Sequence, residues 1–153
     1  METTFNKNIV TVFTLKLTVC GLLMILLTMQ SCKKDNPKLE TDRVREILTD
    51  RTWNIQTVTI GSTDKTTAYD GMTLSFTNTS YFAVNGGLVW PNTGTWAFAD
   101  KTGKLITRGD GLAITVEEAT AVKLVLKLTW AKTTLGSGRT SSLAGEHVFT
   151  FSK

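Results

Sequence analysis

The chain has 153 residues, one histidine, two cysteines and a formal net charge of +4. This length is typical of a single domain. Basic and acidic residues are scattered along the sequence. Nucleic-acid-binding proteins instead gather their basic residues on one face, so we expect no nucleic-acid partner.

The first 31 residues differ in character from the rest. Lys7 and Lys16 accompany a run of thirteen uncharged residues, Leu17 to Met29. That run suits a secretory signal and is shorter than the ~20 residues of a membrane-spanning helix. Ser31 then places a small residue directly before Cys32. The pattern resembles the lipobox of bacterial lipoproteins, and the segment after Cys32 is similar to that of Bacteroidota lipoproteins.

This resemblance implies a signal peptide at 1–31, cleaved before Cys32, and a lipidated cysteine carrying acyl chains such as palmitate. Residues 32–40 then form a flexible tether, and residues 41–153 form the folded domain. We expect anchoring to the outer membrane, on the periplasmic or the surface-exposed side. An ordinary cleaved signal peptide and an uncleaved anchor are the alternatives. Cys20 would leave with the signal, so the mature chain would contain no disulfide.

The folded domain begins with one predicted helix. Within residues 41–50, Val44, Ile47 and Leu48 fall on one helical face, and Thr41 is placed to cap the N-terminus. A helix this short is not stable alone, so we expect it to lie against the rest of the domain.

From Thr52 onward, apolar and polar residues alternate, which is the period of a half-buried strand. The turn signals between these segments predict eight strands, at 53–60, 72–76, 80–85, 94–99, 104–108, 112–118, 122–130 and 146–152. The segment 122–130 is the clearest, because Leu124, Leu126 and Leu128 share one face while Lys123 and Lys127 point away.

Eight sequential strands with short connections predict an all-β fold, an eight-stranded antiparallel up-and-down barrel with a short N-terminal helix. Such a barrel leaves no exposed sheet edge. Its interior is either packed solid with side chains or holds one small ligand. A β-sandwich, or a strongly bent open sheet closed by the helix, is the alternative.

The domain is similar to the lipocalin-like lipoproteins of Bacteroidota. The likeness is carried by the segments 94–98 and 114–128, by Trp53 at the start of the first strand and by the last strand at 146–152. The likeness covers about residues 40 to 153. Lipocalins proper open their first strand with Gly-x-Trp, and Arg51 stands here at the glycine position. The resemblance implies a ligand-binding barrel.

The bulky residues expected to point inward are the candidates for ligand contact. His147 shares a strand face with Phe149 and Phe151, so it is expected inside the barrel, either contacting a ligand or hydrogen-bonded near the barrel mouth. The candidate ligand-binding residues are Trp53, Phe76, Phe82, Trp90, Trp96, Phe98, Trp130, His147 and Phe149.

The connection at 84–94 contains an apolar triplet, Leu88, Val89 and Trp90, between Gly86-Gly87 and Pro91. A surface loop rarely needs such residues. The triplet is either a lid, a partner-binding patch or a membrane-dipping element, or else a segment packed onto the core.

No catalytic set can be assembled, so we expect no enzyme activity, no cofactor and no metal. A single histidine without a companion ligand does not build a usual zinc site. Glu117 and Glu118 are adjacent in a strand and are expected on opposite faces, which excludes a glycosidase pair. Two hypotheses remain: a carrier of a small apolar or amphiphilic ligand, and a solid-cored lipoprotein that docks an envelope protein.

Overall fold

The computed structural model describes residues 38–131 and 143–153. Lys38–Lys153 forms one compact unit. The predicted signal peptide, Cys32 and most of the tether lie outside the described residues. In the described part, a single α-helix, α2 (Glu40–Thr49), precedes the strands, and a short 3-10 helix, η1 (Thr66–Tyr69), follows the second of them.

The strands form one continuous antiparallel sheet. They are β1 (Thr52–Ile60), β2 (Thr63–Asp64), β3 (Thr73–Phe76), β4 (Ser80–Val84), β5 (Thr93–Phe98), β6 (Leu105–Arg108), β7 (Ala113–Ala119), β8 (Lys123–Trp130) and β9 (Gly145–Ser152). All eight predicted strands are present, with ends that differ by at most one residue. The two-residue β2 and the helix η1 were not predicted.

The sheet closes on itself because β1 pairs with both β3 and β9. The first residues of β1 pair with β3, and the rest of the strand pairs with β9. Apart from β2, which pairs only with the last two residues of β1, the strands follow one another in sequence order around the barrel. The predicted eight-stranded up-and-down barrel is therefore confirmed, and the architecture is consistent with a lipocalin-like fold.

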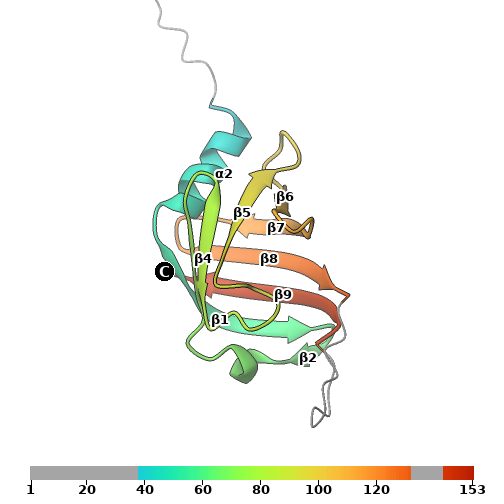
Figure 1. Ribbon diagram of the computed structural model, residues 1–153. Coiled ribbons are helices and arrows are strands. Elements are labelled where there is room, and N and C mark those ends of the chain that lie inside the picture. The colour runs from blue at the N-terminus through green and yellow to red at the C-terminus, as the bar shows by residue number, and fades with distance from the viewer. Residues whose placement is uncertain (1–37, 132–142) are drawn as a thin grey trace, which may run out of the picture. The chain divides into compact units, whose positions relative to one another are not determined.

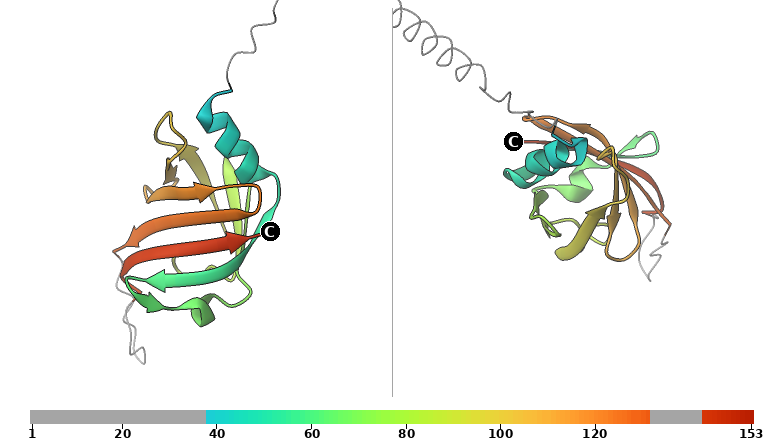
Figure 2. Two further views of the ribbon diagram at one scale, coloured as in Figure 1. Left: turned by 180° about the vertical axis from the view of Figure 1, so that it is seen from behind. Right: turned by 90° about the horizontal axis from the view of Figure 1, so that it is seen from above.

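Two groups of strands form the walls of the barrel. Figure 2 (left) shows β7, β8, β9 and β1 side by side as one broad face. In Figure 1, β4 and β5 run at a steep angle to that face. Helix α2 lies toward one end of the barrel, whereas η1 and β2 lie toward the other (Figure 1).

The strand β8 shows how the sequence specifies the wall. Its leucines are buried as predicted, and its lysines stay on the outer face. There Lys123 pairs with Glu118 and Lys127 pairs with Glu117, each at 2.7 Å. The prediction that the two glutamates face opposite sides is wrong, because the register shifts between Val116 and Glu118 and both carboxylates reach outward.

Helix α2 begins one residue before the expected cap. Leu39 is the N-cap residue and makes no side-chain cap, so the predicted capping role of Thr41 is wrong. Instead, Glu40 and Asp42 place negative charge in the first turn, where the helix dipole favours it. Val44 and Leu48 are buried against the barrel as the periodicity predicted.

Trp53 connects the helix to the barrel. Its side chain is fully buried at the start of β1, and its indole nitrogen donates a hydrogen bond to the Leu48 carbonyl oxygen at 3.2 Å. The core of the unit comes from both helices, from the connection between β4 and β5, and from the inward face of every strand except β2. Since the closed sheet and its core are contained in residues 38–153, this unit has what a domain needs to fold by itself.

Candidate functional site

The predicted ligand-contacting residues fall into separate aromatic clusters. Phe76, Trp96 and Phe98 form one cluster, with edge-to-face ring separations of 5.6 Å for Phe76–Trp96 and 5.2 Å for Trp96–Phe98. The guanidinium of Arg45, from helix α2, lies 5.3 Å from the Trp96 ring and 5.1 Å from the Phe98 ring. This helix-side cluster is closed off by α2, and we assign it a role in joining the helix to the barrel.

The second cluster surrounds Phe149 in strand β9. The rings of Tyr69, Trp90 and His147 lie 5.2, 6.1 and 5.7 Å from that of Phe149. Trp90 also packs edge to face against Tyr81 at 5.4 Å. Because Tyr81 comes from β4 and Phe149 from β9, the Trp90 indole lies between two walls of the barrel. We call these five residues the Phe149 cluster.

The inward orientation predicted for Phe82 is wrong. Tyr81 and Ala83 are buried, so alternation along β4 turns Phe82 to the outside, where it is 52% exposed. Val84 follows on the same outer face and is also exposed. The inward orientation predicted for His147 is confirmed, and Trp130 is buried as well.

The connection between β4 and β5 enters the barrel. Val89 and Trp90 are fully buried, while Leu88 before them is exposed. The Trp90 amide donates to the Gly86 carbonyl oxygen at 3.0 Å, which folds the segment into a tight turn. Of the two alternatives for the apolar triplet, packing onto the core is confirmed for Val89 and Trp90. We call residues 85–92 the plug loop.

Arg108 holds the plug loop in place. Its side chain is 2% exposed, and its Nη1 donates to the Val89 carbonyl oxygen at 2.6 Å. Its Nε and Nη2 donate to the two carboxylate oxygens of Asp110 at 2.9 and 2.7 Å. This forked geometry is the strongest arrangement available to an arginine and a carboxylate.

Aromatic rings enclose the rest of the guanidinium. Its central carbon lies 5.5 Å from the Trp90 ring and 6.0 Å from the rings of Tyr81 and Trp130. A cation over an aromatic face is stabilised by the ring quadrupole, by about 2 kcal/mol where water is excluded. Arg108 therefore links the plug loop, the barrel wall and the exposed Asp110 in one unit, which we call the Arg108 latch.

Three polar atoms of the Phe149 cluster are buried without a hydrogen-bond partner in the described structure. They are the Tyr69 hydroxyl, the Trp90 indole nitrogen and Nε2 of His147. A buried polar group without a partner costs about 1–3 kcal/mol. Three such groups around one phenylalanine leave this part of the described interior with the largest group of unpartnered polar atoms.

The chemical roles of these atoms follow from their surroundings. Nδ1 of His147 lies 3.1 Å from the Gly145 carbonyl oxygen, which can only accept, so Nδ1 carries a proton. Burial lowers the pKa of His147, which favours the neutral ring and leaves Nε2 as an acceptor. Burial raises the pKa of Tyr69 to about 12, so its hydroxyl keeps its proton. The cluster thus offers one acceptor, one indole donor and one hydroxyl.

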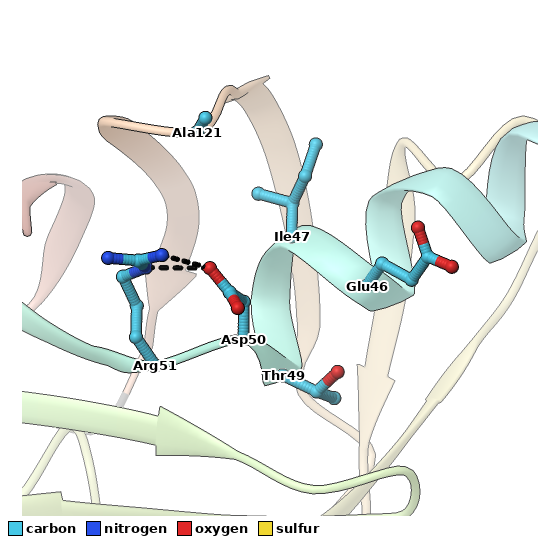
Figure 3. A pocket seen from close by; sticks show the side chains of 6 residues that line it. All are labelled: Glu46, Ile47, Thr49, Asp50, Arg51 and Ala121. Atoms are coloured by element: carbon cyan, nitrogen blue, oxygen red, sulfur yellow. Dashed lines mark hydrogen bonds and ion pairs between the residues drawn. The ribbon is translucent and has the colours of Figure 1, made fainter.

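Two surface grooves differ in how they relate to these clusters. One, of about 450 Å³, lies where helix α2 ends and is lined by Glu46, Ile47, Thr49, Asp50, Arg51 and Ala121. Figure 3 shows that Arg51 in this groove is paired with Asp50. The other, of about 340 Å³, includes Tyr81, Pro91, Gly94, Arg108 and Asp110 in its lining, so it leads from solvent to the Arg108 latch.

Within residues 38–131 and 143–153, no group of three His, Cys, Asp or Glu side chains is placed to hold a metal ion. The described residues also include no helix of the length and apolar character needed to cross a bilayer. The chain matches no protein-family model, and no curated protein is significantly similar to it in sequence. Its class therefore rests on architecture: a closed lipocalin-like barrel, a fold that is compatible with ligand binding.

The sequence reasoning missed Arg108 and Tyr69. Arg108 follows the buried Ile106 by two residues, so the strand period already placed it on the inner face. Tyr69 belongs to η1, which carries no strong helical pattern. No local signal places its ring against a strand that lies eighty residues later in the sequence.

The ion pair in the latch predicts a pH-dependent stability. Arg108 holds the pKa of Asp110 down at about 2, below the ~3.9 of an unfolded chain. The pair therefore stabilises the fold above about pH 4, and this contribution is lost as the pH falls toward 2. We expect Asp110→Asn to lower the free energy of unfolding by about 1–2 kcal/mol near pH 7, because Arg108 keeps a buried charge without its counter-ion.

Urea unfolding followed by tryptophan fluorescence between pH 7 and pH 2.5 measures this effect. The difference between Asp110→Asn and the native sequence should shrink as the pH falls. Asp50→Asn is the control, since Asp50 and Arg51 form a pair at the surface, where loss should cost under ~1 kcal/mol. A difference for Asp110→Asn that stays constant down to pH 2.5 would contradict the role of the pair.

Proposed function

We propose that the chain is a non-catalytic, lipid-anchored binding protein of a bacterial cell envelope, whose barrel holds a small apolar or amphiphilic ligand in the place now taken by the Trp90 side chain. The observation that carries this proposal is the set of three unpartnered polar atoms in the Phe149 cluster. An interior built only for stability gains from apolar groups at such positions.

The plug loop explains how a filled barrel can accept a ligand. The loop is the one stretch of the Phe149 cluster that belongs to neither a helix nor a strand, because Tyr69, Tyr81, His147 and Phe149 all lie in η1, β4 or β9. Lifting Trp90 exposes a space bounded by Tyr81, Phe149 and Arg108, whose rings and guanidinium now contact it. The groove that leads to Arg108 then provides a route from solvent.

The contacts of the latch determine the fraction of molecules in which the plug loop is open. A ligand that needs an opened loop has an apparent affinity reduced by the fraction of molecules that are open. Changes that disfavour the seated Trp90 should therefore tighten binding, provided that the barrel wall stays intact.

Two neighbouring glycines give a matched test of this mechanism. A Cβ on Gly86 would lie 2.4 Å from the Trp90 Cβ and 2.5 Å from its carbonyl oxygen, so alanine there is incompatible with the seated loop. A Cβ on Gly87 would meet no atom within 4 Å, although its φ of +60° strains alanine. Gly86→Ala should therefore lift Trp90, and Gly87→Ala should leave it seated.

We expect Gly86→Ala, in residues 33–153, to bind N-phenyl-1-naphthylamine at least tenfold more tightly than the native sequence, since ~1.4 kcal/mol of added bias toward the open loop is a factor of ten. Gly87→Ala should stay within about threefold. Fluorescence titration of the probe measures both, with circular dichroism to verify the fold. Absence of probe binding by all three folded proteins would overturn the carrier proposal.

Anchoring belongs to the same proposal and rests on the resemblance of residues 1–37 to a lipoprotein signal and tether. Cys32→Ser should release the protein from the membrane fraction and abolish incorporation of labelled palmitate. Ser31→Thr, which keeps the cysteine, should leave labelling detectable. A Cys32→Ser protein that still carries labelled palmitate would contradict lipidation at this cysteine.

A second candidate function, docking of an envelope protein, is supported by the outer face of β4. Phe82 and Val84 are exposed there, and Leu88 is exposed in the plug loop that follows. A contiguous exposed apolar patch marks an interaction surface, and Phe82 and Val84 share one face of one strand. This candidate gains support if none of the glycine variants binds the probe.

A further inference from the structure

We infer that the Phe149 cluster selects neutral ligands with a hydroxyl head group over carboxylates of the same shape. This inference rests on the proposed function and adds the chemical class of the ligand. It rests on two features of the interior: the buried polar atoms that have no hydrogen-bond partner, and the positive charge of Arg108, which Asp110 already neutralises.

The unpartnered atoms match a hydroxyl. With Trp90 lifted, the rings of His147 and Tyr69 still lie against Phe149, whose ring also borders the space that the indole leaves. The two rings are neighbours, with centroids 6.5 Å apart in an edge-to-face arrangement. A ligand hydroxyl can donate its proton to Nε2 and accept the proton of the Tyr69 hydroxyl. One group of one ligand would thereby satisfy two buried atoms that now have no partner.

A carboxylate does not fit the same atoms. It has no proton to give to Nε2 of His147, so acceptor would face acceptor. Arg108 is the buried cation of the described barrel interior, and the forked bonds to Asp110 already neutralise it. A second carboxylate beside Arg108 would meet the like charge of Asp110 and would lose its own hydration without compensation.

A purely apolar ligand fits the space but leaves both atoms unpartnered. It should bind more weakly than its hydroxylated counterpart by the value of the hydrogen bonds. Two net hydrogen bonds correspond to roughly a tenfold gain in affinity.

Three compounds of nearly equal shape test the selection: 2-naphthalenemethanol, 2-naphthoate and 2-methylnaphthalene. Each has two fused rings, close in size to the indole that it would replace. Competition against N-phenyl-1-naphthylamine, with residues 33–153 carrying Gly86→Ala, gives their dissociation constants. We expect the alcohol to bind about tenfold more tightly than the hydrocarbon and at least tenfold more tightly than the carboxylate.

Tyr69→Phe isolates the head-group interaction. It removes one unpartnered hydroxyl and keeps the ring that packs on Phe149, so the fold should be as stable or more stable. The advantage of the alcohol over the hydrocarbon should fall at least threefold, while the affinity of the hydrocarbon stays unchanged. Tyr81→Phe is the matched variant, because Tyr81 is also a buried tyrosine in contact with Trp90 but its hydroxyl is not among the unpartnered atoms. It should keep the advantage of the alcohol over the hydrocarbon, whether or not both affinities change.

The outcomes separate this inference from the proposed function. Carboxylate binding equal to or tighter than alcohol binding overturns the inference and leaves the carrier proposal standing. An alcohol advantage that Tyr69→Phe leaves unchanged does the same. Absence of binding by all three compounds and by the fluorescent probe overturns both.

Discussion

The hydrogen bond from Arg108 to the Val89 carbonyl oxygen holds the plug loop inside the barrel, and the rest of the interior is arranged around it. Burying a guanidinium costs several kcal/mol unless it is paired and hydrogen-bonded. Here the cost is offset by the forked bonds to Asp110 and by three aromatic rings around the cation. The protein thus buries a charged group at a position where an apolar side chain would have a smaller desolvation cost.

The position of Asp110 shows how the latch is connected to the solvent. Asp110 is 43% exposed, so one half of the ion pair is in contact with solvent while the other half holds a buried loop. A surface groove reaches the same pair. Conditions outside the barrel can therefore act on a loop inside it, which an all-apolar plug would not permit.

The interior itself combines two kinds of packing. On the helix side, Trp53 donates to the Leu48 carbonyl oxygen and the Trp96 indole donates to two backbone carbonyl oxygens, so these large polar-edged rings are satisfied. On the plug side, Tyr69, Trp90 and His147 each bury an unpartnered atom. Three buried atoms without a partner therefore gather around Phe149, which is the part of the barrel where we propose that the ligand binds.

Much of the fold could be predicted from the sequence because apolar and polar residues alternate with period two in eight segments. That alternation alone is enough to recognise a half-buried strand. The same rule predicts Arg108 on the inner face and Phe82 on the outer face. Phe82 was placed inside because it is aromatic, and no position was assigned to Arg108, although the strand period decides both.

Other features had no local signal. The bulge in β7, which brings Glu117 and Glu118 to one face, depends on the register with β8. The Phe149 cluster joins η1, the plug loop and β9, which are far apart in the sequence, and only closure of the barrel brings them together. The depth of the plug loop likewise depends on a contact with Arg108 from another strand.

Hydrogen–deuterium exchange of residues 33–153, with and without saturating N-phenyl-1-naphthylamine, tests most directly whether the ligand replaces Trp90. In the seated loop, the Trp90 amide is bonded to the Gly86 carbonyl oxygen. We expect peptides covering 85–92 to exchange faster when the probe is bound, while peptides from β8 and β9 exchange more slowly. Binding that leaves 85–92 unchanged, or protects it further, would contradict displacement of the plug and place the ligand elsewhere.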